Sequence, residues 1–344
     1  MTRCDLTVRG GGIFGLSIAW EAARRGARVR LIETATIGAG SSGGLVGALA
    51  PHVPENWNAK KQFQLASLLA SEAFFASASA ASGLPTGYAR TGRLQPIADA
   101  AALALAHQRS ELARSLWQGQ ALWQVIRAGP SPWHPASPTG HLIHDTLSAR
   151  IDPRRTVACL TAAIRTTGEV ILGQAENHGP TIWATGLAGL HDLSQALGRP
   201  IGTGVKGQAA TLLYDARDLP QLFVDSVHIV PHDDGSVAIG STSERQWHVA
   251  TTTDAQLDAL IARARAALPA LQDAPVIARW AGLRPRATTR APLLGAWPAR
   301  PGHFIANGGF KIGFGMAAKV AQTMVDLVLE NRDTIPSEFR TTAL

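Results

Sequence analysis

The stretch that decides the fold is a run of glycines close to the start of the chain: Gly10-Gly11-Gly12-Ile13-Phe14-Gly15. The run is a complete G-x-G-x-x-G motif, placed between a strand pattern at residues 6–8 and an apolar helical pattern that ends at Gly26. A second strand pattern over residues 27–32 leads into Glu33. A strand, a glycine turn, a helix, a second strand and an acid, in this order, are typical of the βαβ unit that binds dinucleotides.

Each glycine of this motif has a physical role. Gly10 makes the tight turn, Gly12 lets backbone N–H groups approach a pyrophosphate, and Gly15 lets the helix pack closely on the strand. The positive end of the helix dipole suits phosphate groups. Glu33 stands where an acid accepts hydrogen bonds from a ribose diol. These residues therefore predict a dinucleotide site.

The composition is that of a globular protein. The chain has 344 residues, of which 46% are hydrophobic and 17% charged, and at this length two domains are the default. No segment is expected to cross a membrane, and the first strand pattern begins so early that no signal peptide is expected before it. Cys4 and Cys159 are the two cysteines. Neither a disulfide framework nor a metal site is predicted from them, which favours a cytoplasmic location.

The formal net charge of +7 is open to two interpretations, a nucleic-acid partner or an acidic substrate. The 32 lysines and arginines are scattered along the chain and never occur more than two in a row. A nucleic-acid partner is therefore not expected.

The rest of the chain combines helical and β-rich segments. Residues 38–49 are too apolar for a flexible linker and are typical of backbone that lies flat against a ligand. Helices are expected over residues 62–82, 98–117, 156–164, 254–268 and 316–330, and strands over 181–186, 204–214, 222–231 and 236–242. Thr253 and Gln256 form an expected capping box for the helix at 254–268.

A further glycine-rich segment, residues 307–315, precedes the last helix and suggests a second place where backbone meets the ligand. A flavin dinucleotide is long enough to span both places. The sequence predicts an α/β fold, in which a discontinuous Rossmann-like FAD-binding domain carries an inserted antiparallel β-sheet substrate domain. The FAD-binding domain is assigned residues 1–85, 141–197 and 276–344, and the substrate domain residues 86–140 and 198–275.

Together these residues resemble the FAD-dependent D-amino-acid oxidase family, most closely its glycine oxidase and sarcosine oxidase-like bacterial members. The resemblance covers nearly the whole chain and rests on an ordered set of motifs. They are Gly10 to Gly15 with Glu33, Ser41-Ser42 with Gly47, Trp183-Ala184-Thr185-Gly186, Val205-Lys206-Gly207-Gln208, Trp280-Ala281-Gly282-Leu283-Arg284-Pro285, and Gly308 to Gly315.

The resemblance implies non-covalent FAD and a set of cofactor contacts. Glu33 and Thr34 would lie near the adenosine ribose, and Ser41 and Ser42 near the phosphates. The strand that ends in Gly186 would pass the dinucleotide. Contacts with the cofactor are also implied for Ile13 and Phe14, and contacts with the isoalloxazine for Val46, Gly47, Ala48, Gly309, Phe310, Lys311, Ile312, Gly313 and Phe314.

The resemblance also implies a substrate anchor. Arg284 matches the arginine of a Gly-x-Arg-Pro motif that grips a substrate carboxylate, for which the guanidinium fork is well suited. His228 stands where the family often has a tyrosine, and Lys311 where glycine oxidases carry an arginine. His52 follows the glycine loop at a place from which it can reach the active-site side. Arg9 stands where an aliphatic residue is usual.

The implied activity is oxidation of a small amino acid or carboxylated amine. A hydride passes from Cα to flavin N5, water hydrolyses the imine, and O2 reoxidises the flavin to give H2O2. Lys311 would stabilise the charge that develops at the flavin, or bind a second acidic group of the substrate. Three alternatives stay open: a flavin amine dehydrogenase with another acceptor, a carboxymethylamine oxidase for tRNA wobble uridine, and a non-catalytic FAD-binding sensor. The oligomeric state is not predicted.

Overall fold

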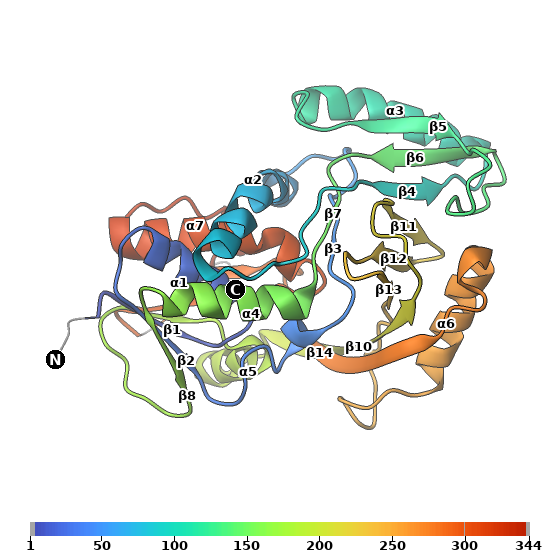
Figure 1. Ribbon diagram of the computed structural model, residues 1–344. Helices are drawn as coiled ribbons and strands as arrows, with labels where there is room; N and C mark the ends of the chain where they lie inside the picture. The colour runs from blue at the N-terminus through green and yellow to red at the C-terminus, as the bar shows by residue number, and fades with distance from the viewer. Residues whose placement is uncertain (1–3, 299, 342–344) are drawn as a thin grey trace.

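The computed structural model describes residues 4–298 and 300–341, which form two large sheets with helices packed against them (Figure 1). The first sheet has six strands in the order β15 (Leu293–Ala296), β16 (His303–Asn307), β9 (Thr181–Trp183), β1 (Leu6–Arg9), β2 (Val29–Glu33) and β8 (Glu169–Leu172). Its strands run parallel except for β15, which is antiparallel to β16.

The βαβ unit at the N-terminal end is confirmed, with α1 (Ile13–Arg24) between β1 and β2. Gly10 has a φ of 107°, and a Cβ atom there would lie 2.4 Å from the carbonyl oxygen of Ala184. A Cβ atom on Gly15 would lie 1.9 Å from the carbonyl oxygen of Gly10. The turn and the close approach of helix and strand therefore both require glycine.

Helices α1, α4 (Pro153–Arg165) and α7 (Gly313–Glu330) pack against this sheet, and α2 (Ala59–Ser82) packs against α4 and α7. Figure 1 shows them gathered in the part of the molecule that contains β1 and β2. A further helix, α5 (Gly186–Leu197), contributes Leu190 and Leu193 to a separate core that contains residues of both sheets.

Helix α2 corrects the expectation that no segment has the length and apolarity of a membrane span. Its 24 residues include an 18-residue window with a mean hydropathy of 1.2, which meets that criterion by length and composition. However, Phe63, Leu68 and Phe75 of this helix are buried in the core, and the helix contacts α4 and α7. This is the position of an apolar core helix in a globular fold.

The second sheet has eight strands in the order β14 (Val276–Ala287), β10 (Gly202–Leu213), β13 (Ser236–Gly240), β12 (Val227–Pro231), β11 (Gln221–Val224), β4 (Arg93–Pro96), β6 (His141–Asp145) and β5 (Trp123–Arg127). Its strands pair antiparallel except for β4 and β11. Helix α3 (Ala100–Leu116) contacts β5, and α6 (Ala255–Ala267) contacts β10, β12 and β13 (Figure 1).

The inserted antiparallel sheet thus agrees with the predicted fold class. Strands β6 and β14 pair within it, although they lie in segments that the sequence assigned to the FAD-binding domain. A short antiparallel pair, β3 (Ala48–Leu49) and β7 (Ala149–Arg150), lies apart from both large sheets. The domain boundaries along the chain stay a prediction.

Two local features differ from the sequence-based expectation. The strand expected over 222–231 is a hairpin of β11 and β12, whose turn residues Asp225 and Ser226 both have positive φ angles, 48° and 62°. The capping box was wrong, because Asp254 caps α6: its carboxylate accepts a hydrogen bond from the N–H of Gln256 at 3.0 Å. The short Asp side chain reaches this N–H from one residue later than Thr253.

Arg9 also has a structural explanation. Its guanidinium donates hydrogen bonds to the side chain of Asn177 and to the carbonyl of Ala175. It also lies 5.1 Å from the ring centre of Trp183. Arg9 therefore holds the loop between β8 and β9 against the end of the sheet.

Candidate active site

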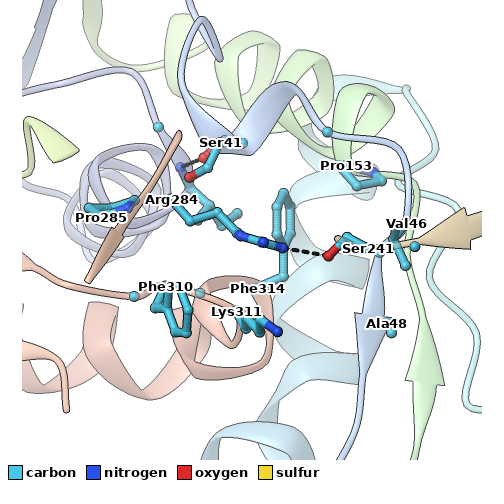
Figure 2. Close-up of a pocket in the computed structure, with 18 of the residues that line it drawn as sticks. Ser41, Val46, Ala48, Pro153, Ser241, Arg284, Pro285, Phe310, Lys311 and Phe314 are labelled. Atoms are coloured by element: carbon cyan, nitrogen blue, oxygen red, sulfur yellow. Dashed lines mark hydrogen bonds between the residues drawn. The ribbon is translucent and has the colours of Figure 1, made fainter. Parts of the chain in front are cut away.

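A cavity of about 460 Å³ is lined by residues from both large sheets, a volume within the range of small-molecule sites. Figure 2 shows part of this lining, with Ser41, Arg284, Phe310 and Lys311 around the open space. The structure brings together most of the residues that the sequence singled out. These are Gly12, Ile13, Phe14, Ser41, Ser42, Val46, Gly47, Ala48, Gly186, His228, Arg284, Gly309, Phe310, Lys311, Gly313 and Phe314.

Several predicted cofactor residues lie behind the lining or beside it. Gly10 and Gly15 provide the close contact of β1 with α1, and Ile312 is the N-cap residue of α7. The Glu33 carboxylate accepts hydrogen bonds from the N–H of Gly11 at 2.7 Å and from the N–H of Ala35 at 2.8 Å. Thr34 follows it and is exposed.

His52 is not among the residues that line the cavity. Its backbone N–H donates to the side-chain oxygen of Gln64 at 2.8 Å, and its ring nitrogen Nδ1 contacts the same oxygen. Burial lowers the pKa of His52, with smaller contributions from Lys60 and Lys61. His52 therefore contacts Gln64 of α2, and a role for it in the site stays a prediction.

The helix ends that face the cavity differ from the others in their caps. Helices α1, α5 and α7 begin at lining residues, and none has a side-chain cap. Helices α2, α3 and α6 are capped by Asn58, Asp99 and Asp254, and α4, whose Pro153 reaches the cavity, by Asp152. Free N–H groups and the helix dipole attract anions. The cavity therefore offers three positive helix ends to a ligand with phosphate groups.

The glycine loops shape the cavity for a long, flat ligand. A Cβ atom on Gly12 would have only the Ser42 hydroxyl nearby, at 3.3 Å, so this backbone is open towards the cavity. The Ser42 hydroxyl accepts a hydrogen bond from the N–H of Ile13 at 2.9 Å. Gly47 has a φ of 65°, and a Cβ atom there would lie 1.7 Å from the carbonyl oxygen of Ile151. The residues present therefore fit a flavin dinucleotide.

Arg284, on β14, is buried with 7% of its surface exposed. Its guanidinium donates hydrogen bonds to the Ser241 hydroxyl, to the carbonyl of Lys206 at 3.2 Å and to that of Thr242 at 2.6 Å. Nε has no hydrogen-bond partner among the described residues. Burial lowers the pKa of Arg284 to about 10, a shift that the charge of Glu244 opposes. Arg284 is therefore a fixed cation in need of an anionic partner.

A buried ionic network supports Arg284 from behind. Lys206 is 2% exposed, and its ammonium lies 2.9 Å from a carboxylate oxygen of Asp254 and 3.6 Å from one of Glu244. Glu244 also accepts hydrogen bonds from Gln208, at 3.0 Å, and from Thr242. Since Lys206 and Thr242 supply the carbonyl groups that hold Arg284, the network fixes the position of its guanidinium.

His228 lies on β12, and its ring centre is 4.7 Å from that of Phe223. Burial lowers the pKa of His228 to about 3, and the positive charges of Arg93 and Lys311 contribute. The imidazole is therefore neutral at physiological pH. Its Nδ1 atom is buried without a hydrogen-bond partner in the described part of the chain.

Lys311 is exposed in the open cavity. Partial burial lowers its pKa, and so do the charges of Arg284 and Arg286. Its ammonium lies 5.8 Å from the ring centre of Phe310, a favourable distance for a cation–π contact.

Several other residues also line the cavity, although no sequence motif pointed to a site role for them: Phe223, Ser226, Ser241, Trp280 and Asn307. Trp280 and Asn307 lie in segments that the sequence singled out. Phe223 and Ser226 belong to the hairpin that carries His228. The pair Asp225-Ser226 is the local signal for its turn, which the expected strand over 222–231 passed over. Ser241 reaches the cavity because β13 pairs with β10, a contact that no local pattern reveals.

The described residues hold no group of three or more His, Cys, Asp or Glu side chains that could bind a metal ion. Cys4 and Cys159 are both free, and neither lines the cavity.

Comparisons with known proteins agree with this geometry. The model of the FAD-dependent oxidoreductase family (DAO) matches residues 5–327. The chain therefore belongs to this family and is an FAD-dependent oxidoreductase.

Glycine oxidase from Pseudomonas aeruginosa is 30% identical over 47% of this chain and 46% of its own length, so that match spans less than half of the relative. Glycine oxidase from Bacillus licheniformis is 24% identical over 96% of this chain and 94% of its own length. The crystal structure of glycine oxidase from Geobacillus kaustophilus has a TM-score of 0.83 at 19% identity, covering 99% of this chain and 98% of that one. At this identity the structure establishes the shared fold.

Proposed function

We propose that this FAD-dependent oxidoreductase oxidises the C–N bond of a small amino acid or carboxylated amine, with O2 as electron acceptor. The observation that carries the proposal is Arg284. Its guanidinium is buried at the cavity and has no ion-pair partner among the described residues. A carboxylate is the complementary ligand, because it accepts paired hydrogen bonds from a guanidinium.

Bound FAD would supply the acceptor for the hydride that leaves the substrate Cα. The chain's own residues would bind and orient the substrate. Arg284 binds the carboxylate and so fixes the position of the neighbouring Cα. Ser241 and the carbonyl of Thr242 hold the guanidinium in place. His228 stays neutral, and its Nδ1 atom is available for a hydrogen bond to a polar group of the substrate.

Relatives named glycine oxidase support a small amine as the substrate and O2 as the acceptor. An amine dehydrogenase with a different acceptor is the second candidate, because the same cavity would serve its reductive step. A cytoplasmic location also belongs to this proposal and is supported by the two free cysteines.

The test is an anaerobic screen of the FAD-loaded protein with amino acids, N-alkyl amino acids and plain amines. We expect the absorbance band of oxidised flavin to bleach with carboxylated amines and much less with plain amines. Air is then admitted, and formation of H2O2 together with return of the band would support the oxidase. Bleaching that air does not reverse would favour the dehydrogenase. The proposal fails if no carboxylated amine bleaches the band.

A further inference from the structure

We propose that the substrate carries two carboxylates: Arg284 binds the one next to the reacting carbon, and Lys311 binds the second. This inference rests on the proposed function and narrows its substrate class to aminodicarboxylates.

The charges that line the cavity support this inference. Arg284 and Lys311 are the charged side chains among the described lining residues, and none of those residues is Asp or Glu. A ligand with one carboxylate would neutralise one of two neighbouring cations. Since an unpaired charge in a partly desolvated site is unfavourable, the lining is complementary to a dianion.

The ammonium of Lys311 is free to take such a partner. It makes no hydrogen bond or ion pair with the residues that the structure describes. Two other lysines, Lys60 and Lys206, each donate a hydrogen bond. Lys60 donates to the carbonyl of Arg290 at 2.6 Å, and Lys206 donates to Asp254 at 2.9 Å. Burial lowers the pKa of Lys311 most, and repulsion from the positive charges of Arg284 and Arg286 lowers it further. A bound carboxylate would relieve this repulsion.

Phe310 fixes the relative position of the two cations. Its ring centre lies 5.7 Å from the guanidinium of Arg284 and 5.8 Å from the ammonium of Lys311. Its backbone, with a φ of 44°, donates a hydrogen bond to the carbonyl of Pro285 at 3.1 Å. Figure 2 shows both cationic side chains extending from the Phe310 side of the cavity towards that of Val46. One small molecule with two carboxylates can therefore meet both charges.

Matched substrate pairs test the inference in the FAD-loaded protein. N-methylglycine becomes iminodiacetate, and alanine becomes aspartate, when a carboxylate replaces one methyl hydrogen. We expect that, in at least one pair, kcat/KM for anaerobic flavin reduction is at least ten-fold higher with the dicarboxylate than with its monocarboxylate partner. In Lys311→Met this preference should fall at least ten-fold, and Lys311→Arg should restore part of it. Lys319→Met, which removes a positive charge outside the lining, is the matched control and should keep the preference.

Binding of unreactive analogues gives a second measurement. Diglycolate and methoxyacetate are the ether counterparts of iminodiacetate and N-methylglycine, and their binding can be followed through the flavin spectrum. We expect diglycolate to bind at least ten-fold more tightly, and this difference to vanish in Lys311→Met.

The outcomes separate this inference from the proposed function. If monocarboxylates reduce the flavin and bind as well as their dicarboxylate counterparts, the inference is overturned and the proposed function stands. If Lys311→Met slows only the reaction of reduced flavin with O2, Lys311 acts on the oxygen step, and the inference is again overturned. If no carboxylated amine reduces the flavin, both proposals fail.

Discussion

The guanidinium of Arg284 lies 5.7 Å from the ring centre of Phe310. Arg284 belongs to strand β14 of the eight-stranded sheet, whereas Phe310 lies between β16 of the six-stranded sheet and helix α7. The hydrogen bond from the N–H of Phe310 to the carbonyl of Pro285 joins the same two segments. The candidate substrate anchor is therefore fixed to the glycine loop beside the cofactor cavity, so a change in either segment would alter the distance between substrate and flavin.

Glu33→Ala is expected to weaken FAD binding. The Glu33 carboxylate is held by the N–H groups of Gly11 and Ala35, in the position from which it would accept hydrogen bonds from the ribose. Hydrogen bonds to a charged group contribute roughly 1.5–3 kcal/mol each, so the FAD dissociation constant should rise at least ten-fold. Titration of the apoprotein with FAD, followed by flavin fluorescence, measures this change. Glu169→Ala, which removes an exposed carboxylate from β8, is the control. An unchanged dissociation constant in Glu33→Ala would contradict the ribose assignment.

Lys206→Met should destabilise the fold by about 3–5 kcal/mol, because removing one partner of a buried ion pair leaves the other charge uncompensated. The charge left behind is that of Glu244, which is 6% exposed. Urea denaturation measures the loss. The double variant Lys206→Met/Glu244→Gln removes the orphaned charge and should recover much of the stability. If the double variant is as unstable as the sum of the two single variants, the two side chains do not act as a pair.

His228 should make the stability of the protein depend on pH. Its pKa in the folded protein is about 3, while an unfolded histidine titrates near about 6.5. Between these values the unfolded chain binds a proton that the folded chain does not, so stability falls as the pH falls through this window. Urea midpoints at pH 7 and about pH 4.5 should therefore differ less in His228→Gln than in the wild type. The exposed His107 supplies the control His107→Gln, which should keep the wild-type difference. Equal differences in all three proteins would refute the prediction.

The parts of the cavity lining that the sequence makes visible are the ones that depend on neighbouring residues. Gly10 and Gly15 are required by contacts within one βαβ unit, so their spacing is visible in the sequence. Ser241 faces Arg284 only because distant strands pair. His52 contacts Gln64 on α2, and no periodicity in the sequence reveals that contact. Sequence patterns therefore reveal the glycine loops of the lining more directly than the contacts around Arg284.

Arg284→Ala is expected to lower kcat/KM for carboxylated amines. The substrate carboxylate would enter the cavity without its partner, at a cost of about 2–5 kcal/mol in transition-state binding, which corresponds to roughly a 30- to 5,000-fold loss. Plain amines should lose much less, because they make no contact with the guanidinium. Stopped-flow flavin reduction under anaerobic conditions measures both, and the FAD dissociation constant should stay near its wild-type value.

Arg279→Ala is the matched control for this variant, because Arg279 lies on the same strand and pairs with Asp258 at the surface, where its side chain is 43% exposed. Arg279→Ala should leave kcat/KM close to the wild-type value for both carboxylated and plain amines. Added guanidinium ion should restore part of the activity of Arg284→Ala towards carboxylated amines, because it can occupy the space that the truncated side chain leaves between Ser241 and Thr242. If Arg284→Ala reduces its flavin with every carboxylated amine as fast as the wild type, Arg284 is not the anchor. An enzyme that oxidises amines without a carboxylate would then become the better account of the cavity.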